Sequence, residues 1–380
     1  MKILITCPTY PPLNSGLGNV VERQAKALVD EGCSVVVATG GAERKSREDP
    51  ASGASVEEFN VTGADWVLQP LKGEVGAYLD FLKNSDFDVI LLNAWQTWST
   101  DVALRNLDQI AGRVILYSNC VSTNLFVPTQ PLRSLARYLA WRPYWFRMGA
   151  VMRKLDGMIF VSEGGCDSRF DDLRLAQRLN QPFSIVPNPL SIEAAERLDA
   201  EVIGDRHQLM AVGSYDWFKG HDFVLRCYAK STAKNRIKLK IFGQRFTAYT
   251  KRLRLLAKRL GLKDEFVEFH ENTPSSVLLD EYSRSLMLLS GSHTECQPLV
   301  LLDAMANGTP FVARARGCIP FLAGGVAVGS EAEAIQVIDR LLKSGSELTS
   351  LGLEGIVAAK ENHHPDAFGE KLLAAISPLS

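Results

Sequence analysis

An acidic residue in the second half of the chain precedes a short helical pattern. Residues 291–297 follow an apolar run at 286–290 and lead into a helix predicted to start at Pro298, a residue favoured in the first helical position. The pair Asn307-Gly308 is typical of a helix end. Glu295 is therefore expected in the loop between strand and helix. A carboxylate there can accept hydrogen bonds from the hydroxyl groups of a sugar.

The start of this helix also offers hydrogen-bond donors. Backbone amides in a first helical turn have no partner inside the helix, so the amides of Leu299 and Val300 can bind a phosphate. Asp303 lies one to two turns further along the same helix. For an isolated acidic pair, a helix cap at Glu295 and a solvent-facing carboxylate at Asp303 is the favoured interpretation. The segment alone leaves both alternatives open.

A glycine-rich turn near the start of the chain is a second anion-site candidate. Gly16-Leu17-Gly18 precedes a helical pattern over 19–30, and glycines there let backbone amides approach an anion closely. As a dinucleotide fingerprint the turn fails, because Val21 stands in the third glycine place and no acidic residue ends the second strand. A turn without any ligand is the equal alternative.

Composition restricts the classes of protein that fit. At roughly 150 residues per domain, the 380 residues suggest two domains, with three small ones as the alternative. With 46% hydrophobic and 22% charged residues, the chain is an ordinary globular protein. The net charge of −1 offers no global attraction for nucleic acid, so no nucleic-acid partner is expected. Scattered cysteines without a C-x-x-C pair, and no apolar run of about 18 residues, favour a cytoplasmic location.

Two series of apolar runs predict the elements that position these candidates. Short unbroken runs between helical patterns indicate strands of parallel sheets buried on both faces. The first series lies at 2–7, 34–39, 88–92, 113–118 and 157–161, and the second at 208–213, 238–242, 266–269, 286–290 and 310–313. The predicted fold class is α/β, with two doubly wound Rossmann-like domains facing across a cleft. We place them at 1–187 and 188–364, with a helix at 365–380 that could pack back on the first.

The second series resembles the GT-B retaining glycosyltransferases, specifically family 4, also described as glycosyl transferases group 1. Their hallmark is Glu-x7-Glu followed by Ala-Met-Ala-x-Gly-x-Pro, and Glu295 and Asp303 occupy its two acidic places. The resemblance covers nearly the whole chain. It implies that the first domain binds the acceptor and the second the nucleotide-sugar donor. Asp303 departs from the pattern, since a shorter side chain stands where Glu would contact the ribose.

Two further motifs carry the resemblance. Lys219-Gly220 matches the lysine that neutralises the donor diphosphate, whereas Ser214 stands where the family has an arginine. Arg245, or alternatively Arg314 or Arg316, is a candidate replacement. In the loop after residues 113–118, Asn119-Cys120 stands in the place of His-Gly, which removes a titratable imidazole.

The resemblance implies the following site residues. Catalytic roles fall to Glu295, Lys219 and Asn119, and donor binding falls to Gly16, Gly18, Ser214, Gly243, Arg245, Cys296, Gln297, Pro298, Leu299, Val300 and Asp303. Lys219 and the backbone amides would stabilise the leaving diphosphate, whose phosphate takes the acceptor's proton, and Glu295 would orient the sugar. Neither a metal nor another cofactor is expected. Asp86-Phe-Asp88 spells the metal motif of GT-A enzymes but precedes its strand, and the histidines form no ligand pair.

Residues 131–154 combine six basic residues and several aromatic residues with no acidic residue. Such a surface can rest on anionic lipid head groups, which predicts peripheral membrane contact; a charged helix with a core-facing aromatic side is the equal alternative. Trp95, Asn124 and Trp141 are candidate acceptor contacts, since tryptophan stacks on sugar rings, although core packing explains the tryptophans as simply.

The sequence thus predicts a retaining, metal-independent glycosyltransferase that moves a sugar from a nucleotide, UDP ahead of GDP, to a glycan, lipid-linked or small-molecule acceptor. The departures at Ser214, Asn119 and Asp303 motivate one rival, a non-catalytic nucleotide-sugar or lipid-binding relative. A nicotinamide oxidoreductase is the second rival.

Overall fold

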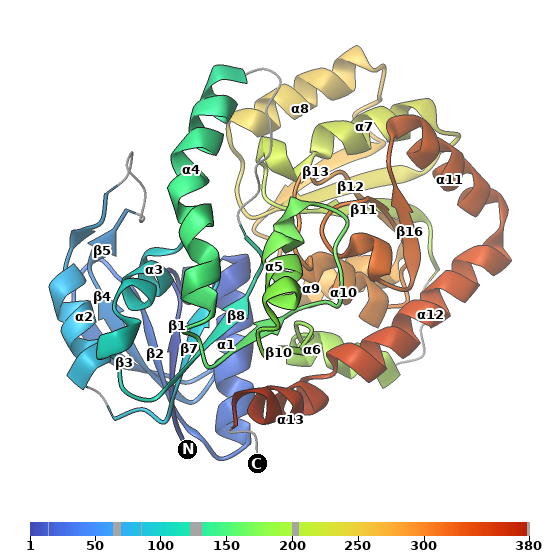
Figure 1. The fold of residues 1–380 in the computed structure, drawn as a ribbon. Coiled ribbons are helices and arrows are strands. Elements are labelled where there is room, and N and C mark those ends of the chain that lie inside the picture. Colours follow the sequence, from blue (N-terminus) through green and yellow to red (C-terminus); the bar gives the residue numbers. More distant parts are fainter. Residues whose placement is uncertain (14, 64–69, 85, 122–130, 200–204, 378–380) are drawn as a thin grey trace. The chain divides into compact units, whose positions relative to one another are not determined.

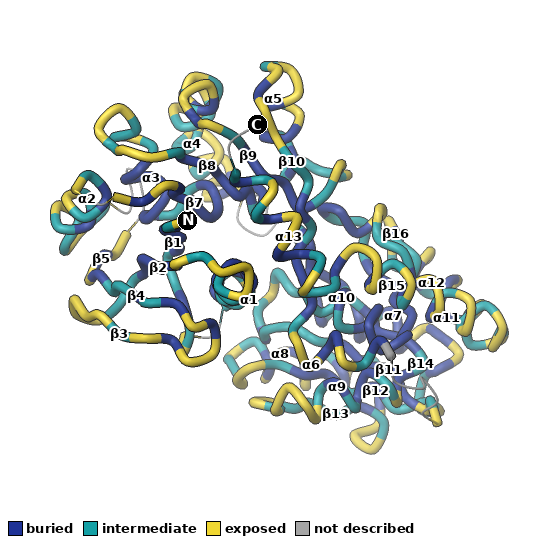
Figure 2. Tube along the Cα trace, turned by 90° about the horizontal axis from the view of Figure 1, so that it is seen from below, coloured by how far each residue is buried: buried dark blue, intermediate teal, exposed yellow. Residues whose placement is uncertain are grey.

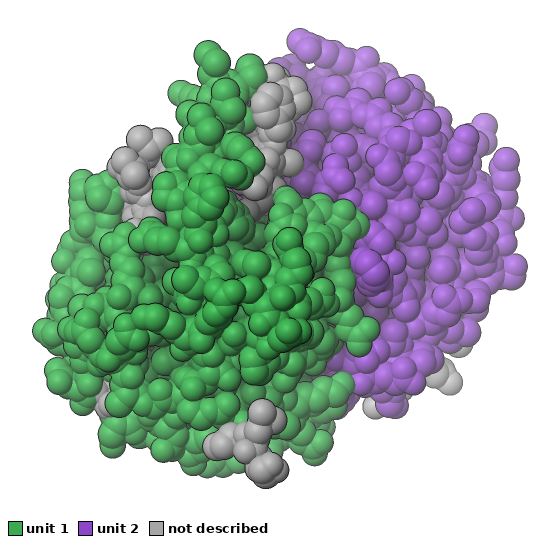
Figure 3. Space-filling view, in the orientation of Figure 1, with its two compact units in different colours: residues 1–189, 365–380 green, residues 190–364 purple. Residues whose placement is uncertain are grey.

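The computed structural model describes residues 1–13, 15–63, 70–84, 86–121, 131–199 and 205–377. Contacts divide the chain into two compact units, one of residues 1–189 with 365–380 and the other of residues 190–364 (Figure 3). Each unit is an α/β unit with its own central sheet (Figure 1). No helix in the described ranges is long and apolar enough to cross a membrane.

The sheet of unit 1 has the strand order β10-β9-β8-β7-β1-β2-β4-β3 over the described residues. All neighbouring strands are parallel except β3, which runs antiparallel to β4 at the edge. The strands are β1 (Lys2–Thr6), β2 (Ser34–Gly40), β3 (Lys45–Asp49), β4 (Ala54–Phe59), β7 (Val89–Asn93), β8 (Arg113–Ser118), β9 (Gly157–Phe160) and β10 (Phe183–Ile185), with β5 (Val61–Thr62) and β6 (Lys72–Gly73) as a separate ribbon. The five apolar runs predicted in this half are confirmed as strands, with ends that differ by a residue or so.

Helices alternate with the strands of unit 1 along the chain, and their apolar faces cover the sheet. They are α1 (Gly16–Asp30), α2 (Val75–Asn84), α3 (Trp98–Arg105), α4 (Pro131–Met152), α5 (Asp171–Leu179) and α13 (Pro365–Ile376). The last of these, α13, packs on α1. A side chain at Gly369 would meet Glu31 and the Ala27 carbonyl of α1, so glycine permits this close approach. The terminal helix therefore completes unit 1.

The sheet of unit 2 is parallel, in the order β13-β12-β11-β14-β15-β16 over the described residues. Its strands are β11 (Gln208–Val212), β12 (Lys238–Gly243), β13 (Val267–Glu271), β14 (Ser285–Ser290), β15 (Phe311–Arg314) and β16 (Gly325–Val328). Its helices are α6 (Ile192–Ala195), α7 (His221–Lys230), α8 (Ala248–Arg259), α9 (Ser275–Ser283), α10 (Leu299–Ala306), α11 (Glu331–Lys343) and α12 (Gly345–His363). Two buried apolar clusters, one on each face, hold these helices to the sheet. The strands are accordingly buried while the outer helices carry the exposed residues (Figure 2).

The strand order of each sheet reverses at one point. In unit 2 the chain moves from β11 outward to β13 and then returns to β14 on the other side of β11. In unit 1 the reversal lies between β1 and β7. Ligands of open α/β sheets bind where such a reversal separates the loops at the carboxyl ends of two strands. The loops after β11 and β14, and those after β1 and β7, are therefore the places to look for a site.

Candidate functional site

Lys219 and Glu295 form an ion pair at the reversal point of unit 2. The Lys219 Nζ donates to Glu295 Oε1 at 2.7 Å, and their side chains are 28% and 10% exposed. Lys219 ends a single 3-10 turn after β11, and Glu295 lies in the loop between β14 and α10. The structure thus brings together two predicted site residues separated by 76 positions.

Backbone packing between the two loops fixes this pair. Gly220 follows Lys219 with a φ of 64°, a left-handed conformation that glycine adopts without strain. A side chain at Gly220 would overlap the Gly291 carbonyl, and one at Gly291 would overlap the Gly220 carbonyl. The His293 amide also donates to the Phe218 carbonyl at 2.7 Å. These contacts hold the two loops against each other. We call the two loops together, residues 213–220 and 291–298, the ledge.

Three residues, 296–298, separate Glu295 from the amino terminus of α10. Pro298 caps the helix instead of occupying its first position as predicted, and the first helical residue is Leu299. The Leu301 amide already bonds to the Pro298 carbonyl at 3.0 Å. Within the described residues, the amides of Leu299 and Val300 have no acceptor. They can donate to an anion, and the helix dipole favours negative charge there.

The other predicted residues of unit 2 have diverse surroundings. Gly243 packs against the ring of Tyr215, which a side chain would strike at 2.5 Å, so this glycine serves packing. Arg245 is exposed and forms no ion pair with the described residues. Asp303 is half-buried near Tyr282, whose pKa is raised well above its ordinary value by burial and then by the Asp303 charge. The Ser214 carbonyl accepts from the Asp216 amide at 2.8 Å.

Two further residues of the predicted donor loop have their surroundings fixed by backbone packing. The Cys296 carbonyl accepts a hydrogen bond from the Cys318 amide at 3.1 Å. Gln297 is buried directly before the helix cap. These contacts hold the loop in place, so its shape does not depend on Glu295 alone.

The glycine-rich turn of unit 1 has one amide in use. Ser15 caps α1, and its Oγ accepts a hydrogen bond from the Gly18 amide at 2.9 Å. A side chain at Gly18 would meet Ser15 Oγ at 2.8 Å and the Thr9 carbonyl at 2.9 Å. The space around Gly16 is open, and its amide has no acceptor among the described residues. Of the two predicted glycines, Gly16 is the one with a donor to offer.

A chain of amide side chains crosses the reversal point of unit 1. Asn119 Nδ2 donates to Asn93 Oδ1 at 3.2 Å, and Asn93 exchanges two hydrogen bonds of 2.9 and 3.1 Å with Gln24 of α1. These contacts orient Asn119 at the carboxyl end of β8. The sequence predicted Asn119 but not its partners, because they come from α1 and β7.

Trp95, a predicted candidate for stacking on the acceptor sugar, is buried in the structure. It is only 3% exposed, and its Nε1 donates to Asp172 of α5 at 2.8 Å. Burial raises the pKa of Asp172 to about 6, although hydrogen bonds from Ser118 and Trp95 oppose this rise. A ring covered in this way cannot stack on a sugar, so Trp95 instead links the loop after β7 to α5.

The remaining acceptor candidates lie on or near α4. Trp141 is half-buried, and its ring meets that of Tyr144 in a T-shaped contact with the ring centroids 5.4 Å apart. Tyr144 in turn accepts from the Gln96 amide at 3.1 Å and donates to Asp101 at 2.8 Å. Asn124 lies outside the described residues. Trp141 is therefore part of an aromatic layer that fastens α4 to the loop after β7.

A family model matches part of the second half of the chain. Residues 195–344 match the model of the family described as Glycosyl transferases group 1, and they contain both Lys219 and Glu295. Among curated proteins, none matches this sequence at a significant level.

Solved structures match over the whole chain. Sucrose-phosphate synthase from Thermosynechococcus elongatus is 17% identical, with 98% of this chain and 97% of that chain covered and a TM-score of 0.74. Anabaena Alr3699/HepE, solved in complex with UDP, is 15% identical with full coverage of both chains and a TM-score of 0.73. Trehalose-6-phosphate synthase OtsA is 13% identical, again with full coverage, at a TM-score of 0.71. The fold is GT-B.

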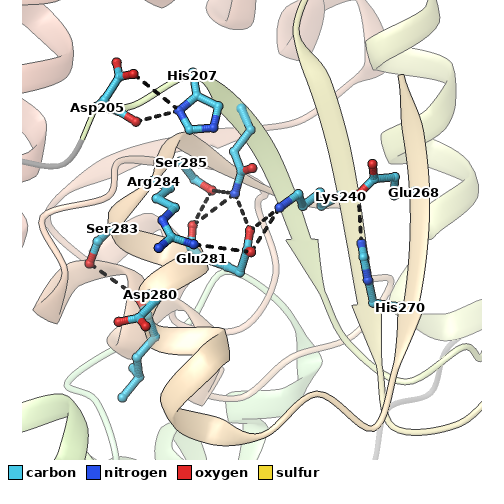
Figure 4. A network of polar contacts seen from close by, with 12 residues as sticks. Asp205, His207, Lys240, Glu268, His270, Asp280, Glu281, Ser283, Arg284 and Ser285 are labelled. Carbon is cyan, nitrogen blue, oxygen red and sulfur yellow. Dashed lines mark hydrogen bonds and ion pairs between the residues drawn. The ribbon is translucent and has the colours of Figure 1, made fainter. Parts of the chain in front are cut away.

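Within this GT-B fold, a second polar network of unit 2 lies away from the Lys219–Glu295 pair. Lys240 of β12 and Glu281 of α9 point toward one another and pair at 2.7 Å (Figure 4). Glu281 also accepts from Gln208 Nε2 at 2.6 Å, and Ser285 Oγ donates to the Glu281 carbonyl at 2.7 Å. Gln208 and Ser285 begin their strands, at the end of the sheet opposite to the ligand loops. This buried network therefore supports the fold of the unit.

The acidic pair near β7 also lies at the wrong end for a ligand. Asp86 and Asp88 precede the first residue of β7, as the sequence predicted. Asp88 Oδ2 accepts from the Lys2 amide at 2.7 Å, and Asp86 pairs with the Lys2 side chain. Within the described part of the chain, no three His, Cys, Asp or Glu side chains gather as a metal site would require.

Proposed function

We propose that this chain is a retaining, metal-independent glycosyltransferase that uses a nucleotide-sugar donor, with UDP ahead of GDP as the carrier. The observation that carries the proposal is the Lys219–Glu295 pair together with the amides of Leu299 and Val300, which have no acceptor among the described residues. A cation and helix amides suit a diphosphate, and a carboxylate suits sugar hydroxyls. The family match over residues 195–344 and the UDP and UDP-glucose complexes of HepE support the same ligand class.

Each group then has a role in transfer. Lys219 and the two amides stabilise the negative charge that develops on the diphosphate as the sugar bond breaks. Glu295 exchanges its contact with Lys219 for the sugar's hydroxyls and orients the ring. The departing phosphate accepts the proton of the acceptor hydroxyl on the same face, so the new bond keeps the configuration of the old one. No protein nucleophile is required.

Unit 1 is the acceptor-binding part in this proposal. Asn119, held by Asn93, presents an amide that can hydrogen-bond a hydroxyl group. The acceptor classes that fit are glycans, lipid-linked sugars and small hydroxylated molecules. Trp95, which is buried and donates to Asp172, has a packing role in this proposal and does not contact the acceptor.

The outer face of α4 supports a lipid-linked acceptor at a membrane surface. Leu132, Leu135, Leu139 and Phe146 are all exposed, up to 81% for Leu132, and their spacing places them on one stripe of the helix. The opposite stripe carries the buried Met148. Arginines flank the apolar stripe without a single acidic residue between 131 and 154. This combination suits shallow insertion into an anionic bilayer.

Vesicle sedimentation tests this contact. Leu132→Asp combined with Phe146→Asp is expected to abolish binding to phosphatidylglycerol vesicles. Leu255→Asp, a change at a 57% exposed leucine of α8, is the matched control and should leave binding unchanged. Equal binding of all three proteins, or binding to neutral vesicles alone, would remove the membrane proposal.

Turnover tests the proposed function itself. The protein is incubated with UDP- and GDP-sugars, and release of free nucleoside diphosphate is measured with and without glycan and lipid acceptors. Slow release that an acceptor accelerates is expected, with the anomeric configuration retained in the product. Tight nucleotide-sugar binding without release, across all acceptors, would favour a non-catalytic binding protein instead.

A further inference from the structure

Two arginines converge on His293, in the loop that carries Glu295. Arg314 ends β15, and its Nη1 lies 3.2 Å from His293 Nδ1 and 3.4 Å from the Gly291 carbonyl. Arg316 Nε donates to the His293 carbonyl at 3.1 Å. Because arginine only donates, His293 Nδ1 must accept, so its proton resides on Nε2. Both arginines are thus anchored to the backbone ledge beside the ion pair.

Neither arginine has a carboxylate at ion-pair distance within the described residues. The acidic groups that act on Arg314 from a longer distance are Asp222 and Glu331, and both pair with Arg226, at 2.8 and 2.5 Å. Both arginines are half-buried. Burial lowers the pKa of Arg314, and the nearby Arg316 charge lowers it further. Positive charge beside the ledge is therefore uncompensated.

Arg316 also lies close to the predicted donor groups. The next residue, Gly317, packs so tightly that a side chain would overlap the Glu295 carbonyl and approach the Cys296 carbonyl. Arg316 Nη1 donates to the Ala315 carbonyl at 2.8 Å, and its Nη2 has no acceptor in the described part of the chain. One edge of the guanidinium is thereby held, and a donor remains for a ligand.

The charge balance of the ledge identifies the ligand chemistry. Lys219 is neutralised by Glu295, and Ser214 carries no charge. The diphosphate of a nucleotide sugar bears a negative charge on each phosphate, which one shared lysine does not balance. Arginine is well suited to phosphate because its rigid fork matches the phosphate oxygens.

We propose that Arg316 is a second phosphate-binding cation of the donor site and that Arg314 is a positioning residue that holds His293, and through it Arg316. This inference rests on the proposed nucleotide-sugar function and deepens it. It also assigns the anion to the diphosphate of the donor, and not to a carboxylate on the transferred sugar. Ser214, in the loop after β11, carries no charge, and Arg316, in the loop after β15, supplies the second positive charge instead.

Calorimetric titration of the intact chain with UDP, UMP and UDP-glucuronate tests the assignment. Arg316→Ala should lower the ratio of UDP to UMP affinity about ten-fold, the loss expected when one charge-assisted hydrogen bond is removed. Arg316→Lys should recover part of that ratio. Arg252→Ala, on the exposed face of α8, is the matched control and should leave it unchanged.

The positioning role has its own readout. Arg314→Ala should also lower the UDP to UMP ratio, but the double variant should bind no more weakly than Arg316→Ala alone, since both changes act through one contact. Additive losses would remove the positioning role. Unchanged melting temperatures of the single variants exclude general unfolding.

The outcomes separate this inference from the proposed function. If the wild-type chain binds UDP and Arg316→Ala binds it equally well, the assignment of Arg316 is wrong while the transferase proposal stands. If Arg316→Ala lowered the affinity for UDP-glucuronate alone, Arg316 would bind the carboxylate of the sugar and not the diphosphate, and the inference would be wrong. If the wild-type chain binds neither UDP nor GDP, both proposals fail together.

Discussion

The buried carboxyl of Asp101 should make unit 1 less stable as the pH rises. Asp101 lies in the first turn of α3, where Tyr144 donates to its Oδ1 and its Oδ2 has no partner among the described residues. Burial raises the pKa of Asp101 from an ordinary 3.8 to about 7, against the opposing effects of Tyr144, Gln96 and Arg147. We predict that Asp101→Asn removes this pH dependence.

The direction and the size of this change in stability with pH follow from proton linkage. Between pH 4 and 7 the folded chain holds a proton on Asp101 that the unfolded chain has released, so stability falls as the pH rises through this window. A difference of about 3 pKa units corresponds to about 4 kcal/mol at pH 8. Asparagine is never charged, and its amide group lacks a partner in the same way as the protonated carboxyl of Asp101, so this cost is common to both proteins. A net gain of about 4 kcal/mol is therefore expected at pH 8.

Melting temperatures measured from pH 4.5 to 8 test this prediction. The variant should melt about 10 °C above the wild type at pH 8, and close to it at pH 4.5, where a protonated Asp101 has the same unpartnered group. Asp172 titrates in the same direction in both proteins and so cancels from the comparison. Asp108→Asn, a change at a 78% exposed side chain, is the control. Parallel pH profiles for wild type and Asp101→Asn would refute the reasoning.

Three further variants probe the ledge and the core of unit 2. Gly220→Ala should cost about 2 kcal/mol or more, seen as a lower melting temperature, because the backbone of residue 220 is in the left-handed conformation and the new side chain would overlap the Gly291 carbonyl. Lys240→Met should cost about 3 kcal/mol by the same measurement, since it removes the nearer of the two cations of the buried Glu281 and leaves only Arg284, at 4.0 Å. Glu295→Ala should slow nucleoside diphosphate release by at least about ten-fold while changing UDP affinity less, in a comparison of kcat with Kd.

Much of the fold could be predicted because its strands are apolar and parallel. The buried runs that became β1, β7, β8 and β14 have no other reasonable interpretation, and their order along the chain indicates two doubly wound units. The edge strand β3 was missed because its residues are mostly polar and exposed, so its pairing with β4 leaves no apolar pattern. Short strands such as β10 give too few residues for any periodicity.

The site could be predicted where it depends on local sequence. Glu295 before a helix is visible in the local pattern, whereas Lys219 was predicted only from the family resemblance, and the structure brings the two into contact. The role of Trp95 could not be predicted, because its partner Asp172 is 77 residues away. The arrangement of Arg314 around His293 likewise depends on the neighbouring order of β14 and β15, which no local pattern encodes.

A crystal structure with a bound nucleotide sugar, chosen by thermal-shift screening of UDP and GDP donors, tests the central proposal most directly. We predict diphosphate oxygens within hydrogen-bond distance of the Leu299 and Val300 amides and of Lys219 Nζ, with Glu295 on a sugar hydroxyl. A nucleotide bound at another place, with the 2.7 Å contact between Lys219 and Glu295 intact, would contradict it.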